Sequence, residues 1–287
     1  MSDLIILLTG GLVAASCSLL GSFLVLRRMA MVGDAISHAV LPGIAAAFLA
    51  SGSRDPIVVL PGAALMGVLA VFCIQWLRQS GVQEDAATGV VFTALFAAGV
   101  LMVSLFARHI DLDLEHVLYG EIVFVPYDEL HLFGKWLGPR ALWFVGATFA
   151  LNAAVVAIFY KQFKLCSFDP LLAASLGVPV TFFHYLLMAL VSLTTVAAFD
   201  SVGAVLVVGM LVLPPATAYL LTDSLARMIG LGMAIGVADA AIGYGVSVAL
   251  DASTAGCMVT VAGLALALAF LFSPKHGILM RPKIKRA

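Results

Sequence analysis

Residues 4–26, LIILLTGGLVAASCSLLGSFLVL, form an apolar run that contains no charged side chain. A run of about 20 apolar residues is long enough for a helix to cross the hydrocarbon core of a bilayer. A backbone in that core has to satisfy its own hydrogen bonds, so the run predicts a membrane-spanning helix. Arg27 and Arg28 follow directly, and we expect the chain to leave the membrane there.

The same pattern recurs along the whole chain of 287 residues. Hydrophobic residues make up 63% of it and charged residues 11%, whereas a soluble domain has about 25% charged residues. We therefore expect an all-α polytopic membrane protein surrounded by lipid, with one transmembrane domain over residues 1–287. Its net charge of −1 gives no indication of a nucleic-acid partner. The predicted helices cover residues 4–26, 33–50, 57–77, 87–107, 141–160, 181–199, 202–222, 228–250 and 255–272.

The distribution of basic residues predicts the orientation of these nine helices. With the N-terminus outside, eleven of the 15 lysine and arginine residues lie in cytoplasmic segments and four lie in external segments. The opposite orientation would invert this bias, although cytoplasmic loops are normally the ones enriched in lysine and arginine. We therefore expect an external N-terminus and a cytoplasmic C-terminus.

A short helix is predicted within the cytoplasmic connection, at about residues 169–177. An aspartate caps its start, a proline suits its first turn and a glycine suits its end. Its leucines would be exposed, either to dock on a partner protein or to lie among lipid headgroups. The residues that shape or expose this helix are Asp169, Pro170, Leu172, Leu176 and Gly177.

The external loop at 108–140 is rich in acidic residues and histidines. Such a loop can collect a cation, but it can equally be a solvated face or a docking surface, and the sequence leaves these interpretations open. The residues concerned are His109, Asp111, Asp113, Glu115, His116, Glu121, Asp128, Glu129 and His131.

Asp34 and His38 are the strongest candidates for a site inside the membrane. Ionisable side chains in a span are costly and are candidates for function by default. A spacing of four residues puts both on one face of a helix. Carboxylate oxygen and imidazole nitrogen together suit divalent first-row metals. The alternative is structural: Asp34 caps the helix and His38 bonds a neighbouring carbonyl.

Two further aspartates are weaker candidates for metal ligands. Asp239 is predicted near the centre of its span, where it can complete a metal site or bond Tyr244 or a serine on another helix. Asp200 is predicted near the external end of its span, beside a tight break. A helix-break cap and a role in metal passage are both open for it.

Motifs of ATP hydrolysis and of common hydrolases are absent from the sequence. The chain has no G-x-x-x-x-G-K-[ST] phosphate loop, no G-x-S-x-G elbow and no H-E-x-x-H. We therefore expect a transport subunit that is not an enzyme, and if ATP drives transport, another chain binds it.

Four stretches together resemble the permeases of manganese, zinc and iron ABC importers, the ABC-3 type. The resemblance runs in order over nearly the whole chain. The stretches are Arg27-Arg-Met-Ala-Met-Val-Gly-Asp-Ala-Ile-Ser-His-Ala-Val-Leu-Pro-Gly43, Val117-Leu-Tyr-Gly-Glu121, Phe168-Asp-Pro-Leu-Leu-Ala-Ala-Ser-Leu-Gly177 and Val202-Gly-Ala-Val-Leu-Val-Val-Gly-Met-Leu-Val-Leu-Pro-Pro-Ala-Thr-Ala218.

The resemblance implies a fold, a set of partners and a set of roles. The fold would be that of type II ABC importers, in a bacterial cytoplasmic membrane. Two permeases, identical or related, would pair with two ATPase subunits and an external metal-binding protein. The helix at 169–177 would be the coupling helix that docks on the ATPase. Asp34 and His38 would line the path of a transported metal, with no cofactor permanently bound, and manganese is favoured over iron and zinc.

Other transport classes remain alternatives at this stage. A secondary or proton-coupled carrier would use Asp34, Asp200 and Asp239 as ion sites, and such carriers often show inverted repeats, of which the sequence has no convincing example. A haem or siderophore permease of the same fold would need a wider and less acidic path. An intramembrane enzyme is disfavoured because Ser37 and His38 are adjacent and do not face each other.

Overall fold

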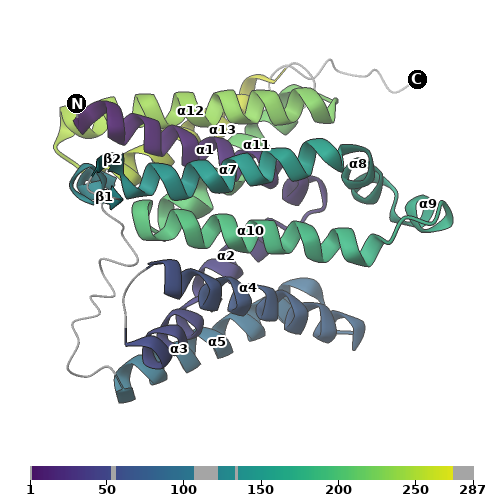
Figure 1. Ribbon diagram of the computed structural model, residues 1–287. Helices are drawn as coiled ribbons and strands as arrows, with labels where there is room; N and C mark the ends of the chain where they lie inside the picture. Colours follow the sequence, from purple (N-terminus) through teal and green to yellow (C-terminus); the bar gives the residue numbers. More distant parts are fainter. Residues whose placement is uncertain (1, 53–55, 107–121, 133–134, 274–287) are drawn as a thin grey trace.

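The computed structural model describes residues 2–52, 56–106, 122–132 and 135–273 (Figure 1). Helices account for almost all of its regular structure. In chain order the elements are α1 (Ser2–Leu26), α2 (Ala30–Ala39), α3 (Leu41–Ser51), α4 (Pro56–Gln79), α5 (Glu84–Phe106), the 3-10 helix η1 (Ile122–Tyr127), β1 (Glu129–Leu132), β2 (Lys135–Pro139), α7 (Arg140–Ile158), α8 (Tyr160–Phe168), α9 (Pro170–Ser175), α10 (Val180–Val202), α11 (Ala204–Leu221), α12 (Leu225–Leu250) and α13 (Thr254–Phe272).

Within these described residues, nine helical segments are long and apolar enough to cross a membrane. The prediction of nine spans in an all-helical polytopic bundle is confirmed. One span, Ala30–Ser51, consists of α2 followed by α3. The span predicted at 33–50 is present, but its helix is interrupted at Val40. Pro42 has no N–H to donate to the carbonyl of His38, four residues earlier, so the helical hydrogen-bond ladder cannot continue.

A second boundary also differs from the prediction. We expected a tight break near Asp200, but α10 continues to Val202 and ends at Gly203. Gly203 has φ +79° and separates α10 from α11. Glycine adopts positive φ without the penalty that a side chain brings, so the chain turns there. Asp200 therefore lies in the last turn of α10, before the break.

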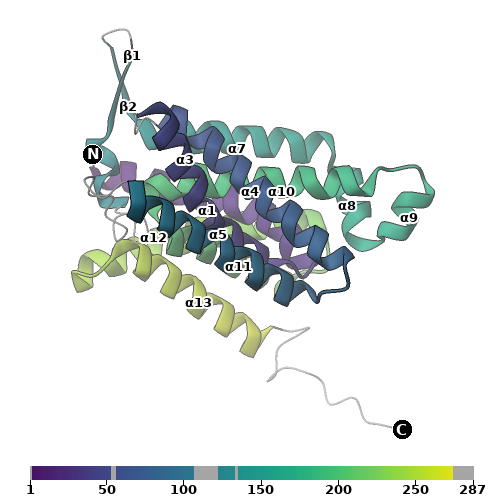
Figure 2. The same cartoon turned by 90° about the horizontal axis from the view of Figure 1, so that it is seen from below.

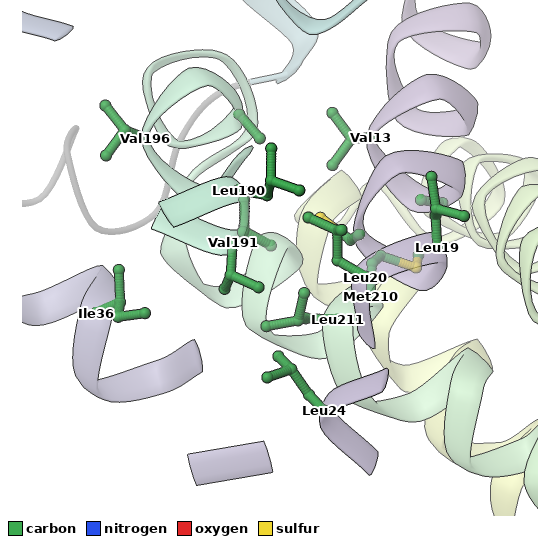
Figure 3. Packing of buried hydrophobic residues seen from close by; sticks show 14 of the residues in the cluster. Val13, Leu19, Leu20, Leu24, Ile36, Leu190, Val191, Val196, Met210 and Leu211 are labelled. Atoms are coloured by element: carbon green, nitrogen blue, oxygen red, sulfur yellow. The ribbon is translucent and has the colours of Figure 1, made fainter. Parts of the chain in front are cut away.

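The helix α1 forms the centre of the larger group of helices. It packs against α7, α10, α11 and α12, and Figure 3 shows its residues Leu20 and Leu24 facing Met210 and Leu211 of α11. Glycine allows the backbones to approach. A Cβ atom on Gly21 would overlap the carbonyl oxygen of Leu211. Small residues at such points let helices pack closely in lipid, where packing drives association.

The helices α2 to α5 form a second group beside the first (Figure 1). The helices α3 and α4 approach through Gly43 and Gly62, since a Cβ on either glycine would overlap the backbone of the other. The contacts with the first group come mainly from α4 and α2, both of which pack against α10.

The two ends of the bundle carry different elements. Figures 1 and 2 show the start of α1 near the hairpin of β1 and β2 at one end, and α8 and α9 projecting from the other. The hairpin is antiparallel, with Leu132 opposite Lys135. Only a loop was predicted over 108–140, and η1 and the hairpin are elements that this prediction did not contain.

Candidate functional site

Asp34 and His38 lie on one face of α2, as their spacing predicts. His38 Nε2 is 3.6 Å from Asp34 Oδ1, and the two side chains keep 27% and 42% of their surface exposed, respectively. The adjacent Ser37 is buried and donates to the carbonyl of Gly33 in the same helix. Ser37 is therefore committed to its own helix, while a carboxylate oxygen and an imidazole nitrogen remain open on the surface of the chain.

The alternative that Asp34 caps its helix was wrong. The helix α2 begins at Ala30, with Met29 as the residue before it, so Asp34 lies in its second turn. A capping side chain accepts from the N–H groups of the first turn. Asp34 has no such position, and its interaction in the described structure is with His38.

Two phenylalanines of α5 hold the imidazole ring in place. The centroid of the His38 ring is 5.5 Å from that of Phe92 and 5.7 Å from that of Phe96. The contact with Phe96 is edge-on, at an interplanar angle of 84°. These contacts restrict the ring and keep Nε2 directed toward Asp34. Neither phenylalanine was predicted as part of the site, although their spacing of four residues on an apolar helix indicates a shared face.

The pair provides two donor atoms for a cation. Among the residues that the structure describes, no group of three or more His, Cys, Asp or Glu side chains could hold a metal ion. A first-row metal takes at least four ligands in most sites. A cation at Asp34 and His38 would then take its other ligands from water, from neutral oxygen atoms or from another chain, which favours a weak and transient site.

The structure separates Asp239 from this pair. Asp239 is 4% exposed, and its Oδ2 atom is buried without a hydrogen-bond partner. Its helix α12 packs mainly against α1, α11 and α13, whereas α2 packs mainly against α4, α5 and α10. The alternative that Asp239 bonds Tyr244 was wrong, because the Tyr244 hydroxyl donates to Asp3 Oδ1 at 2.7 Å.

Those of the remaining candidates that the structure describes lie at the end of the bundle where α1 begins (Figure 1). Asp128 is exposed after η1. Glu129 and His131 lie on β1, and Asp200 lies at the end of α10, but the side chains of these three are not among those described. His109, Asp111, Asp113, Glu115, His116 and Glu121 lie outside the described residues.

The predicted capped helix on the opposite side is present as α9. Asp169 Oδ1 accepts from the N–H of Leu172 at 2.9 Å, and Pro170 occupies the first turn. Gly177 follows the helix with φ +79°. Its N–H donates to the carbonyl of Ala174, and the N–H of Val178 donates to that of Ala173, both at 3.0 Å. This pair of bonds is the Schellman arrangement that ends helices at glycine.

The leucines of α9 are directed away from the bundle. Leu171 is 83% exposed, Leu172 46% and Leu176 65%, and α9 projects beyond the ends of the long helices (Figure 2). A well-capped helix with three exposed leucines forms a compact apolar surface, and such surfaces mark contacts with proteins or membranes.

Comparison with protein families identifies the chain. The profile of the ABC 3 transport family matches residues 4–273. The chain belongs to this family. It is accordingly the membrane permease of an ABC transporter, a system in which the ATPase is a separate subunit, and it is a multi-pass protein of a bacterial membrane.

Several bacterial transport proteins are similar to this chain over nearly its whole length. The manganese transport system membrane protein MntD of Bacillus subtilis is 51% identical, covering 96% of this chain and 94% of that protein. The zinc transport system membrane protein TroD of Treponema pallidum is 43% identical, covering 98% and 77%. A probable iron transport system membrane protein of Haemophilus influenzae is 34% identical, covering 94% and 90%.

A solved structure has the same architecture. PsaBC from Streptococcus pneumoniae, in complex with Fab, matches with a TM-score of 0.79 at 32% identity, covering 95% of this chain and 92% of that chain. A metal-chelate type ABC transporter in an inward-facing conformation matches with a TM-score of 0.66 at 17% identity, which shows a shared fold. The predicted ABC importer permease fold is confirmed.

Proposed function

We propose that this permease imports a divalent transition metal ion, with manganese preferred and iron or zinc as the other candidates. The observation that carries the proposal is the open pair of Asp34 and His38 on α2. Imidazole nitrogen with carboxylate oxygen suits manganese, iron and zinc. Similar proteins are described as manganese, zinc and iron transport proteins, and a manganese protein is the most similar of the three named above.

In this proposal Asp34 and His38 supply ligands to a transient site along the path of the metal. Their half-exposed position lets a hydrated ion exchange water for the two side chains without opening the bundle. A weak site is an advantage, because conduction needs exit as well as binding. Asp239 has at most a secondary role, since α12 packs mainly against α1, α11 and α13, and Asp200 at the end of α10 is kept as a weaker candidate.

The helix α9 is proposed as the coupling helix that binds the ATPase. Asp169, Pro170 and Gly177 fix its two ends, which leaves Leu172 and Leu176 free to enter a groove on the partner. Replacing these two leucines with glutamate should leave insertion unchanged and release the ATPase during purification. Ser80→Glu, an exposed position on the same side of the bundle, is the matched control. Retention of the ATPase by the double variant would contradict the assignment.

The proposed complex contains two permeases, identical or related, two ATPase subunits and an external metal-binding protein. The permease lies in the bacterial cytoplasmic membrane with its N-terminus outside. Cysteines introduced at the exposed positions Asp128 and Arg227 test this orientation after removal of the four native cysteines. An impermeant maleimide added to intact cells should label position 128 only. Labelling of position 227 only would reverse the orientation.

Metal content tests the proposed substrate most directly. Cells with and without the gene are grown in limiting manganese, iron and zinc, and all three metals are measured together. We expect manganese to fall most in cells without the gene and to return when the wild-type permease is restored. A fall in iron or zinc alone would replace manganese as the substrate, and no change in any of the three would reject metal import.

A further inference from the structure

A short connection joins α9 to α8, the helix that follows directly after α7. The helix α8 ends at Phe168, and the single residue Asp169 separates it from α9. The N–H of Asp169 still donates to the carbonyl of Leu165 in α8, at 2.9 Å, while its side chain caps α9. A displacement of α9 would therefore also move the end of α8.

Two side-chain contacts join α8 to the end of α1. The rings of Phe163 and Phe23 have their centroids 5.5 Å apart. One helical turn further along both helices, Arg27 Nε donates to Ser167 Oγ at 3.0 Å. Phe23 and Arg27 are four residues apart, and so are Phe163 and Ser167. Each of these two pairs therefore lies on one face of its own segment. The end of α8 and the end of α1 are consequently held together at two successive levels.

The Arg27 contact is made by a cation that has no carboxylate partner in the described part of the chain. Burial lowers the pKa of Arg27, opposed in part by nearby Cys166, yet a guanidinium stays charged in proteins. Its Nη2 atom is buried without a partner. Hydrogen bonds from a charged donor are roughly twice as strong as neutral ones. Ser167 is thus the side chain that fixes the position of this guanidinium.

The turn after Arg27 is closed by backbone hydrogen bonds and leads directly into α2. The N–H of Arg28 donates to the carbonyl of Val25 at 3.1 Å, and that of Met29 donates to the carbonyl of Leu24 at 2.9 Å. These two bonds form a Schellman turn, with Arg28 at φ +60° in the place where glycine is usual. The helix α2 starts at the next residue, and Asp34 lies in its second turn. A shift of Arg27 therefore moves the start of α2.

We propose that Arg27 is a positioning residue that links α9 to the Asp34–His38 pair through its hydrogen bond with Ser167. The link runs from α9 through α8 and Arg27 to the turn that begins α2. This inference rests on the proposed function, because it assigns a task to the coupling helix and to the metal pair. Arg27 itself touches neither the metal pair nor the ATPase surface of α9.

The test measures Mn²⁺ carried per ATP hydrolysed by the complete transporter in proteoliposomes, containing permease, ATPase and external binding protein. Arg27→Gln and Ser167→Ala remove the hydrogen bond from either side, and the double variant completes a double-mutant cycle. Ser167→Thr keeps the hydroxyl, and Arg28→Gln removes the neighbouring exposed charge. A defect of assembly alone would lower Mn²⁺ uptake and ATP hydrolysis together and leave their ratio unchanged.

We expect the ratio to fall about tenfold in Arg27→Gln and in Ser167→Ala. The double variant should be no worse than either single variant, because the bond is already absent, while Ser167→Thr and Arg28→Gln stay near wild type. An unchanged ratio in Ser167→Ala, additive losses in the double variant or an equal loss in Arg28→Gln would overturn the inference. Absence of ATP-driven Mn²⁺ uptake by the wild-type complex would instead overturn the proposed function, and the inference with it.

Discussion

Asp34 and Asp239 both lie in membrane-spanning helices, but their surroundings are opposite. The Asp34 side chain is 42% exposed and has His38 at 3.6 Å, whereas Asp239 is 4% exposed and has no partner for Oδ2. A charged side chain at the centre of a span costs about 2.5–3.5 kcal/mol on insertion scales. An aspartate is thus exposed in the region of α2 and α5, which we call the open region. In the region of α1, α11 and α12, which we call the sealed region, an aspartate is buried.

The packing of the two regions explains the contrast. The helix α12 approaches α1 and α11 through glycines: a Cβ on Gly232 would overlap the Ser18 side chain, and one on Gly236 would press on Ala14 and Pro214. Close approach of the backbones buries Asp239 between these helices. The face of α2 that carries His38 instead meets the bulky rings of Phe92 and Phe96, which orient the imidazole without covering it. Accessibility, more than acidity, separates the two sites.

The largest expected effect comes from removing the charge of the open site. Asp34→Asn keeps the shape of the side chain, and we expect Mn²⁺ uptake to fall about 100-fold, from the loss of one charge close to the ion. Binding of the ATPase should be unchanged. Asp239→Asn is the matched control and should keep uptake within about threefold, because the sealed carboxyl is buried between helices. Equal losses in both variants would remove the distinction between the sites.

A smaller effect is expected where α1 meets α11 in the sealed region. Pro215 has no N–H for the carbonyl of Leu211, and that carbonyl approaches Gly21. Gly21→Ala should lower the free energy of unfolding by about 1–3 kcal/mol, since the added methyl group overpacks this contact. Thermal unfolding of the purified permease in detergent measures the change.

Gly89 on α5 provides the comparison from the open region. A Cβ on Gly89 would meet no atom within 4 Å, so Gly89→Ala should be neutral or stabilise the helix by up to about 1 kcal/mol. An equal loss of stability in both glycine variants would show that the two regions are packed alike.

The smallest effect concerns the hydrogen bonds that α7 makes with α1 and α10. Asn152 on α7 donates to Ser16 Oγ on α1 at 3.2 Å and to Thr194 Oγ1 on α10 at 2.6 Å. Asn152→Ala should destabilise the permease by about 1 kcal/mol, as for other hydrogen bonds between membrane helices. Thr148→Ala, one turn earlier, removes only a bond within α7 and should have less effect. A loss in Asn152→Ala above that of Gly21→Ala would mean that hydrogen bonds outweigh packing there.

Local features of the sequence were sufficient for several of these elements. The number of spans follows from the length of apolar runs. The ends of α9 follow from Asp169, Pro170 and Gly177, because caps and positive-φ turns depend on residues only a few positions apart. The common face of Asp34 and His38 follows from the helical repeat alone. The role of Asp34 and His38 in metal passage and the role of α9 in ATPase binding remain predictions.

The sequence placed some boundaries wrongly even where the cause is local. The span predicted at 33–50 is interrupted at Val40, because Pro42 cannot donate a hydrogen bond to the carbonyl of His38. The break expected near Asp200 lies at Gly203. Apolar residues on both sides of such breaks give no periodic signal, so the boundary depends on a few hydrogen bonds whose positions the hydropathy pattern does not specify.

Contacts between distant segments were decided only by the tertiary structure. Arg27 and Ser167 are 140 residues apart, and Tyr244 and Asp3 are 241 residues apart. The sequence determined which residues lie on a helix and which of them share a face, because hydrogen bonds within a few residues fix the helical repeat. It did not determine which faces meet, because in lipid nearly every face is apolar and the choice depends on how closely small residues let the backbones pack.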